Sequence, residues 1–440
     1  MKNKQTLILG SGLAGLSAAY HLRGAKNHRA QVFEKTDVVG GTARSYYIDG
    51  FTFDITGHLL HLHHPYTKKL IHKLLGDNIY TCVRKTAIYS KGVYTDYPFQ
   101  VNTYGLPKSV VAECVNGFKE AVKLYPADDQ RQTSFAFQTW SQRTFGKGIH
   151  RHFMKPYNEK LWQVSLKEMT AQWCGMFVPQ PKLDDVIGGS KKNFSKSFGY
   201  NATFIYPQKG GIQVLAESLA RGLDVQLKNP FEQVNWKSKQ LLCADGKWKN
   251  YDHLVSTVPL MELLKRMPKL PRAVDQAMKK LRWTSVLCLN LGVNRANISD
   301  KSWIYFPEKK FVFYRVGFPM NFTPHGAPKG CSSMYVEIGY PPGKTPDFKN
   351  PALLKRVIRD LNRCGILQAP DQVLVSQFIP IPYAYVIYTP DRTETLSTIF
   401  NFLKENHIYS IGRYGEWKYS FMEEAILDGK KTAETILNLF

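Results

Sequence analysis

The sequence of 440 residues lacks the features that mark several classes of protein. None of its seven cysteines belongs to a C-x-x-C pair and their number is odd, so neither a zinc site nor a disulfide framework is indicated. No apolar run reaches the length of a membrane-spanning helix. Met1 leads almost directly into the first predicted strand, without room for a signal or transit peptide. We therefore expect a cytoplasmic protein with reduced thiols, no transmembrane segment and no bound metal.

Acidic residues are scarce as well, because 35 aspartates and glutamates stand against 59 lysines and arginines, for a formal net charge of +24. Such an excess favours an anionic partner. The lysine pairs are spread along the chain, and no zinc finger, RNA-recognition motif or basic arm accompanies them. We therefore expect no nucleic-acid binding. A nucleotide-sugar substrate and peripheral contact with an anionic membrane stay open, and no oligomeric state is indicated.

The first sixty residues contain the strongest motif. Thr6–Leu9 is a short apolar run that predicts a buried parallel strand, and a Gly-x-Gly-x-x-Gly turn follows before a helical pattern. In this turn Gly10 permits a sharp bend, Gly12 lets a pyrophosphate approach the backbone, and Gly15 lets the helix pack closely on the strand. The helix then offers unpaired N–H groups to the phosphate.

Two further segments support a dinucleotide site. A second strand, Gln31-Val32-Phe33, ends at Glu34, about twenty residues past the glycines, where a carboxylate accepts a ribose hydroxyl. Gly40-Gly41 follows, with Arg44 nearby, and gives a second backbone approach to phosphate that a nicotinamide domain does not need. The combination predicts bound FAD, in preference to an ordinary glycine turn in a doubly wound domain.

Four histidines lie between residues 58 and 64, namely His58, His61, His63 and His64. No carboxylate or cysteine cluster stands beside them, so a metal site is disfavoured. We expect His58 to face the cofactor and the other three to line a strand or loop.

The rest of the chain leaves the cofactor domain and returns to it. Residues 107–125 and 134–173 have helical apolar spacing, and Pro156 should kink or restart a helix. Residues 280–390 alternate as strands do, and a last helix begins near Phe421. We predict an α/β fold with three parts. They are a Rossmann-type FAD-binding domain (1–75, 200–265 and 395–440), a helical substrate-domain insertion (76–199) and an antiparallel-sheet substrate domain (266–394).

Several stretches resemble known flavoproteins. The N-terminal turn, Gly40-Gly41 and the Gly-Arg-Tyr-Gly of residues 412–415 are similar to the FAD superfamily of amine oxidases and protoporphyrinogen oxidase. Four stretches resemble, in the same order, UDP-galactopyranose mutase, particularly its eukaryotic-type branch. They are Tyr97–Gln100, Phe153–Asn158 with Trp162, Trp303–Glu308 with Phe313–Arg315, and Gly412–Tyr419. This resemblance spans nearly the whole chain.

The resemblance implies a flavin-dependent isomerase of polysaccharide biosynthesis. In that family reduced FAD attacks the anomeric carbon of a nucleotide sugar through N5, and the diphosphate leaves. The sugar ring then opens and closes again in the other ring size, with no net redox change. For this chain it implies interconversion of pyranose and furanose, or of a related isomer pair. The protein supplies orientation and electrostatics.

The resemblance also implies roles for single residues. Tyr97 and Gln100 match a pair that faces the uracil, and Asn158 with Trp162 the wall of the substrate cleft. Arg315 matches a clamp on the diphosphate, for which an arginine fork is suited. Phenols that contact the same phosphates are matched by Tyr305, Tyr388 and Tyr419. Arg413 matches the arginine beside the flavin, and His58 matches the residue whose backbone meets flavin N5. For Tyr305, Trp162 and Tyr388 the alternative is a place in the core.

The residues expected to contact FAD lie in the glycine segments, at the end of the second strand, in one later strand and at the start of the last helix. They are Gly10, Gly12, Leu13, Ala14, Gly15, Glu34, Lys35, Gly41, Thr42, Ala43, Arg44, Gly57, His58, Phe231, Gly412, Arg413, Ser420, Phe421 and Met422. The N-terminus of the last helix is expected to direct its positive dipole end at a carbonyl of the flavin ring.

One substrate-binding position departs from the family. Where the mutases have a second arginine on the diphosphate, this chain has Phe177. A missing desolvated arginine costs about 2–5 kcal/mol of diphosphate binding unless another cation replaces it, and Lys155 and Lys182 are the candidates. Phe177 favours the main alternative, an FAD-dependent oxidoreductase of the amine oxidase or desaturase type. A basic scaffold that retains FAD as a relic is a third, less favoured interpretation.

Overall fold

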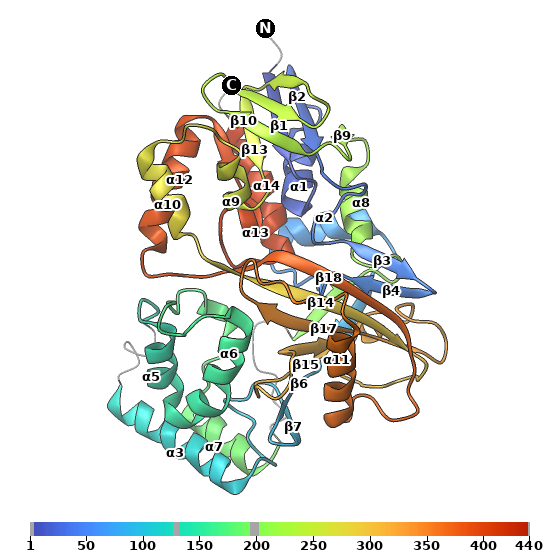
Figure 1. Ribbon diagram of the computed structural model, residues 1–440, viewed down its shortest axis with the longest axis vertical. Coiled ribbons are helices and arrows are strands. Elements are labelled where there is room, and N and C mark those ends of the chain that lie inside the picture. Colours follow the sequence, from blue (N-terminus) through green and yellow to red (C-terminus); the bar gives the residue numbers. More distant parts are fainter. Residues whose placement is uncertain (1–3, 126–131, 194–201, 439–440) are drawn as a thin grey trace.

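The computed structural model describes residues 4–125, 132–193 and 202–438. A parallel sheet with its helices lies at one end of the molecule, a group of helices lies at the other, and a large, mainly antiparallel sheet lies between them (Figure 1). Within the described residues, no helix combines the length and the apolar character needed to span a membrane.

Five parallel strands form the first sheet, in the order β19-β13-β1-β2-β9. They are β1 Lys4–Leu9, β2 His28–Phe33, β9 Val225–Gln226, β13 His253–Ser256 and β19 Ile408–Ser410. Leu7, Ile8 and Leu9 are all buried, which is why β1 appears in the sequence as a continuous apolar run. The sheet confirms the predicted α/β class, and its strands come from all three segments assigned to the cofactor domain.

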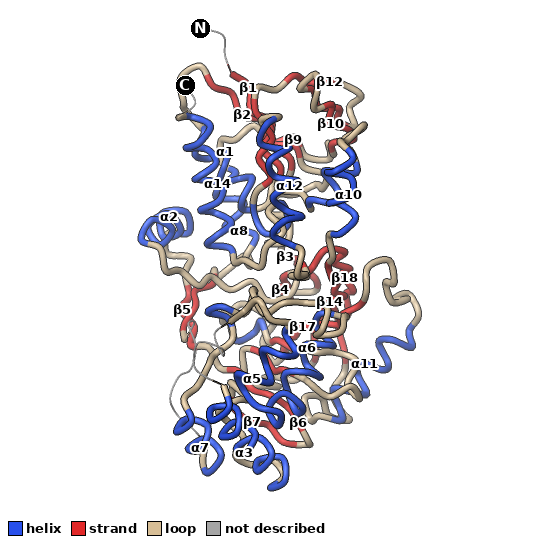
Figure 2. Tube along the Cα trace, turned by 90° about the vertical axis from the view of Figure 1, so that its left-hand side faces the viewer, coloured by secondary structure: helices blue, strands red, loops and turns tan. Residues whose placement is uncertain are grey.

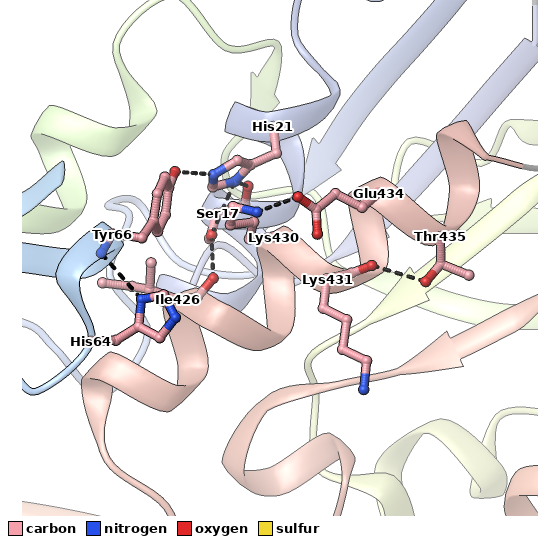
Figure 3. A network of polar contacts seen from close by, with 9 residues as sticks. All are labelled: Ser17, His21, His64, Tyr66, Ile426, Lys430, Lys431, Glu434 and Thr435. Atoms are coloured by element: carbon pink, nitrogen blue, oxygen red, sulfur yellow. Dashed lines mark hydrogen bonds and ion pairs between the residues drawn. The ribbon is translucent and has the colours of Figure 1, made fainter. Parts of the chain in front are cut away.

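The helices of this part are α1 Leu13–Leu22, α2 Pro65–Leu75, α8 Gln213–Ala220, α9 Leu260–Lys265, α10 Arg272–Lys280, α12 Arg392–Glu405, α13 Gly412–Gly415 and α14 Met422–Leu437. α1 and α14 run next to each other (Figure 2). Polar contacts add to their packing, since Ser17 Oγ on α1 donates to the carbonyl of Ile426 at 2.6 Å. His21 Nδ1 donates to the Ser17 carbonyl, so its Nε2 accepts from the Tyr66 hydroxyl on α2 (Figure 3).

Gly429 allows α14 to approach α1 closely. A Cβ there would lie 2.4 Å from the carbonyl oxygen of Ala14 and 2.7 Å from the nitrogen of Ala18. We expect Gly429→Ala to lower the free energy of unfolding by about 1–3 kcal/mol, although alanine is the better helix former, because the two backbones must separate. Urea denaturation measures the change. Lys431→Ala, at an exposed position of the same helix, is the control, and equal stability of the two variants would contradict the prediction.

Seven strands form the large sheet, in the order β18-β14-β17-β16-β15-β6-β7. They are β6 Thr86–Ser90, β7 Val93–Asp96, β14 Trp283–Val293, β15 Trp303–Tyr305, β16 Arg315–Gly317, β17 Ser332–Tyr340 and β18 Val373–Val386. Its pairs are antiparallel apart from β6 with β15. One face is apolar, with Ile304, Val316 and Val336, and belongs to the same buried cluster as Val357 and Leu361 of α11 (Pro351–Arg363). The opposite face of these strands carries polar residues.

The remaining helices are α3 Lys108–Leu124, α5 Phe137–Ile149, a π-helical turn His150–Met154, α6 Lys155–Trp162, short 3₁₀ turns Gly175–Phe177 and Pro319–Asn321, and α7 Leu183–Lys191. Smaller sheets pair β3 Ser45–Ile48 with β4 Phe51–Asp54, β5 Tyr80–Val83 with β8 Thr203–Tyr206, and β10 Phe231–Asn235 with β11 Gln240–Cys243 and β12 Trp248–Asn250. Pro156 lies in the first turn of α6, so it restarts a helix as expected.

Residues 76–199, expected to be a helical insertion, begin instead with the three strands β5, β6 and β7. β6 and β7 extend the large sheet, because Thr86, Ala87 and Ile88 of β6 pair with β15 and β6 pairs with β7. Within the described part of this segment, the helices α3 to α7 lie between Lys108 and Lys191. The expected boundary between residues 199 and 200 lies outside the described residues.

Candidate functional site

The turn between β1 and α1 brings backbone atoms close together. Gly10 has φ +94°, and its N–H donates to the Phe33 carbonyl at 2.8 Å. A Cβ on Gly15 would lie 2.1 Å from the Gly10 oxygen, so only glycine allows the helix to begin there. A Cβ on Gly12 would meet nothing within 4 Å. The space before Gly12 is therefore open, as a pyrophosphate site requires.

The second glycine pair lies against this turn. The Gly40 N–H donates to the Ser11 carbonyl at 2.9 Å, and a Cβ on Gly41 would be 3.1 Å from the Gly12 Cα. Arg44 pairs with Asp37 at 3.3 Å at the edge of this segment. Backbone from two separate segments thus surrounds the same space.

Glu34 is buried at the end of β2. Its Oε2 accepts from the backbone N–H and the hydroxyl of Ser11, at 2.9 and 2.8 Å, and its Oε1 accepts from the N–H and the hydroxyl of Thr36. These bonds hold the carboxylate beside the glycine turn. Its backbone carbonyl accepts from the Asn229 N–H at 2.9 Å, which brings the start of β10, with Phe231, to the same edge. Lys35 is exposed.

The C-terminal motif reaches the same region. A Cβ on Gly412, which has φ +75°, would lie 2.9 Å from the Cβ of Ala14 on α1. Arg413 donates to the carbonyls of Ser420 at 2.6 Å and Ala384 at 3.2 Å, and so fixes the segment before α14. The hydroxyl of Ser420 is buried and has no hydrogen-bond partner among the described residues.

Two buried polar atoms without a partner in the described part of the chain, Ser420 Oγ and His58 Nδ1, belong to residues predicted to contact FAD. Buried polar groups in native proteins are normally hydrogen-bonded, so each of these two atoms is available to bond a ligand atom. With the open space at Gly12 and the carboxylate of Glu34, they make the residues fit FAD.

The register of the large sheet brings site residues into one row. Tyr305 on β15 pairs with Arg315 on β16, and Arg315 pairs with Glu337 on β17. Because alternate residues of a strand face opposite sides, the three side chains lie on the face away from the apolar cluster with α11. Glu337 was not among the predicted site residues. Its signal was a glutamate inside the otherwise apolar Met334–Ile338.

Arg315 and Glu337 form a bidentate pair. Arg315 Nε lies 3.0 Å and Nη2 2.7 Å from the carboxylate oxygens, and the Glu337 side chain is only 1% exposed. Nη2 also donates to the Tyr385 hydroxyl at 3.4 Å. Among the described residues Nη1 has no such partner, so this edge of the guanidinium remains for an anion. Tyr385 is a second residue that the sequence prediction missed, three positions before Tyr388.

Tyr335 packs beneath the row. A Cβ on Gly57 would lie 2.4 Å from its hydroxyl, and a Cβ on Gly317 would lie 2.0 Å from its ring. The two glycines make room for the phenol, which fixes the approach of the segment of His58 to the sheet. Gly57 therefore has a packing role that the FAD assignment did not include.

Burial, with the charges of Arg413 and Arg315, lowers the pKa of His58 to about 4. The imidazole is therefore neutral at pH 7. Tyr385 contacts both arginines, because its hydroxyl accepts from Arg315 Nη2 at 3.4 Å and its ring centroid lies 5.1 Å from the Arg413 guanidinium. The predicted flavin arginine and the predicted diphosphate arginine thus meet at one centre.

Aromatic rings line this centre. Tyr385 and Tyr419 stack with centroids 5.9 Å apart, and the Arg413 guanidinium lies 4.8 Å from the Tyr419 ring. Phe177 lies edge-on to Tyr419 at 4.8 Å and to Phe421 at 5.0 Å. Phe177, at the position where an arginine was expected, therefore places an apolar ring beside the predicted cofactor and substrate residues.

Four of the predicted substrate residues make their contacts within the protein. Tyr97 contacts Tyr305 with centroids 5.7 Å apart. Gln100 is buried and donates to the Pro179 carbonyl at 2.7 Å. Trp162 is fully buried, donates to Asn158 Oδ1 at 3.1 Å and contacts Tyr385. Trp162 thus supports Tyr385 from the core, the alternative place that the sequence left open for it, and Asn158 in turn holds the Trp162 indole.

Other side chains predicted to contact the phosphates bond to groups of the protein itself. The Tyr388 hydroxyl accepts from the Tyr419 N–H at 2.9 Å, and its ring lies under the Arg392 guanidinium at 4.0 Å. Lys155 pairs with Glu159, and Lys182 precedes α7 at an exposed position, where its N–H donates to Asp185 at 3.1 Å. Neither lysine is shown to replace an arginine at position 177.

The histidines after His58 make local contacts. His61 lies 3.2 Å from the Thr203 carbonyl, and the N–H groups of His63 and His64 donate to Glu423 at the start of α14. No metal-binding group of three or more His, Cys, Asp and Glu occurs among the described residues.

Comparison with known proteins gives a family and two kinds of relative. The sequence profile of the family "Flavin containing amine oxidoreductase" matches residues 13–437. A 4,4'-diapolycopene oxygenase of Methylomonas sp is 23% identical over 436 residues, 86% of this chain and 84% of that protein. A 1-hydroxycarotenoid 3,4-desaturase of Flavobacterium sp. (strain P99-3) is 20% identical over 82% of each chain. The crystal structure of a reduced UDP-galactopyranose mutase superposes with TM-score 0.92 and 25% identity, covering 99% of this chain and 96% of that one.

Proposed function

Because this chain belongs to the family of flavin-containing amine oxidoreductases and is an FAD-dependent enzyme, we propose that it interconverts the pyranose and furanose forms, or a related isomer pair, of a nucleotide-linked sugar. The observation that carries the proposal is Arg315, held by Glu337 on the polar face of the sheet with its Nη1 edge left for an anion. The likeness to the mutase structure supports it over the whole chain.

The protein's own residues do three things in this proposal. Backbone at Gly12, the carboxylate of Glu34 and the hydroxyl of Ser420 hold FAD, which in its reduced form supplies the nucleophilic N5. Arg315 stabilises negative charge on the departing diphosphate, and Tyr305, directly across from it, donates a phenol hydrogen. Neutral His58 completes the floor of the site without adding charge.

Binding of the nucleotide is the simplest property to test. We expect UDP, GDP, CDP or TDP to bind the FAD-loaded protein with a dissociation constant that Arg315→Met weakens. Titration followed by flavin absorbance gives each constant. Absence of binding by all four nucleotides would count against the proposal.

Phe177→Arg is expected to tighten nucleoside-diphosphate binding at least about tenfold, because a charge-assisted hydrogen bond adds ~1.5–3 kcal/mol. The new guanidinium can stack on Tyr419, as Phe177 does now. The measurement is the same titration, with Phe177→Leu as the control for loss of the ring. Equal affinities in the arginine and leucine variants would show that position 177 does not face a phosphate.

A second function, FAD-dependent oxidation of an apolar substrate, is favoured by the contacts of Phe177 with Tyr419 and Phe421 and by the two carotenoid enzymes among the relatives. In that case the enzyme consumes oxygen or another electron acceptor in proportion to product. The mutase reaction consumes none, so the stoichiometry separates the two.

A further inference from the structure

Lys160 lies in an unusual setting for a lysine. Its ammonium donates to three backbone carbonyls, those of Phe306 at 2.8 Å, Glu308 at 3.1 Å and Phe313 at 2.5 Å. These carbonyls belong to one segment, residues 306–313, which joins the end of β15 to the start of β16. Tyr305 immediately precedes this segment, and only Tyr314 lies between the segment and Arg315.

Two side chains on one face of α6, Tyr157 and Lys160, contact this connection. Tyr157 lies three residues before Lys160, so the two share a face of the helix. The Tyr157 ring lies edge-on to Tyr305 at 5.3 Å and to Tyr314 at 6.1 Å. The aromatic contacts hold the two ends of the connection, and the ammonium holds its middle.

Few charges balance this ammonium. None of the described carboxylates forms an ion pair with Lys160, although Asp360 on α11 and Glu308 in the connection act on it electrostatically. Glu308 lies near Lys91 and Lys310, and Asp360 accepts from the Val312 N–H at 3.0 Å and lies near Arg363 and Arg356. Burial lowers the pKa of Lys160 to about 7. Desolvating a cation without a paired acid is costly, and the three carbonyls are the groups that compensate this half-buried ammonium.

We propose that Lys160 is a positioning residue: its ammonium fixes residues 306–313 and thereby presents Tyr305 and Arg315 to the site. Three oxygens around one ammonium match its three donors, whereas a neutral amine has two donors and no charge. The connection is therefore expected to loosen when Lys160 loses its proton. The consequence for substrate rests on the proposed function, but the contact with the connection does not.

Hydrogen exchange of the amides of residues 306–314 tests the contact directly. In Lys160→Met we expect exchange at least tenfold faster than in the wild type. Lys155→Met, which removes an ammonium on the same helix that pairs with Glu159, should change it less than twofold. Exchange in Lys160→Met within twofold of the wild type would overturn the proposal.

The wild type provides a second test that needs no variant to fold. After correction for intrinsic exchange, the same amides should exchange several-fold faster at pH 8.5 than at pH 6, while amides of the parallel sheet should not. A pH-independent rate in this connection would also overturn the proposal. Titration with UDP separates the two claims. Failure of the wild type to bind UDP counts against the proposed function, and equal UDP affinity of Lys160→Met and the wild type counts against positioning by Lys160.

Discussion

Replacing Arg315 with methionine is expected to lower the free energy of unfolding by about 3–5 kcal/mol, because it leaves the carboxylate of Glu337 buried without its partner. The Glu337 side chain is 1% exposed and takes both Nε and Nη2 of the guanidinium. Urea denaturation of the FAD-loaded protein measures the loss. Few single substitutions at a binding site are expected to cost this much.

Two further variants identify the cause of this loss. The double variant Arg315→Met with Glu337→Met removes both charges and should recover most of the stability, since buried pairs replaced by apolar side chains are often neutral. Arg29→Met breaks an exposed pair with Asp224 at 3.1 Å and should cost no more than about 1 kcal/mol. If Arg315→Met costs no more than Arg29→Met, the pair is not the buried element described here.

Gly12→Ala is expected to fold normally and to lose FAD. Its Cβ would meet nothing within 4 Å and the φ of Gly12 is −69°, so alanine fits the protein itself. The methyl group would instead stand where the pyrophosphate approaches the backbone, and loss of one or two charge-assisted bonds weakens binding by about ten- to a thousandfold. Flavin absorbance after gel filtration measures occupancy, and urea denaturation of the apoprotein measures stability.

Gly15→Ala is the matched comparison three residues later. Its Cβ would lie 2.1 Å from the Gly10 carbonyl oxygen, so the apoprotein itself should be destabilised. The two variants therefore separate cofactor approach from helix packing. Full FAD occupancy in Gly12→Ala would show that the phosphate lies elsewhere.

Local sequence patterns predicted the fold at the cofactor end of the molecule and FAD as its cofactor. The glycine turn, Glu34 and the segment before α14 can each be recognised from a few neighbouring residues, because a sharp turn and a strand end each need particular residue types. The contacts of Gly12 with Gly41 and of Ala14 with Gly412 join separate segments of the chain, and the local patterns did not predict them.

The polar face of the large sheet could be predicted only in part. Arg315 and Tyr305 were found by resemblance. Their pairing depends on the register between strands, which a local sequence pattern does not determine. Glu337 and Tyr335 enter the site through the register of the neighbouring strands, and Tyr385 enters from β18. For Trp162 the sequence left both a cleft wall and the core open, and the side chain lies in the core behind Tyr385. Nothing near Lys160 in the sequence indicates that three distant carbonyls surround it.

The reaction catalysed under reducing conditions tests the account most directly. The protein, with its FAD reduced by dithionite, is incubated with a panel of UDP-hexoses, and the products are separated by ring form while acceptor consumption is followed. We predict many turnovers from one ring isomer to the other, with no electron acceptor consumed. No isomer from any UDP-hexose, together with acceptor-consuming oxidation of an apolar substrate when the protein is assayed separately with oxidised FAD, would contradict it.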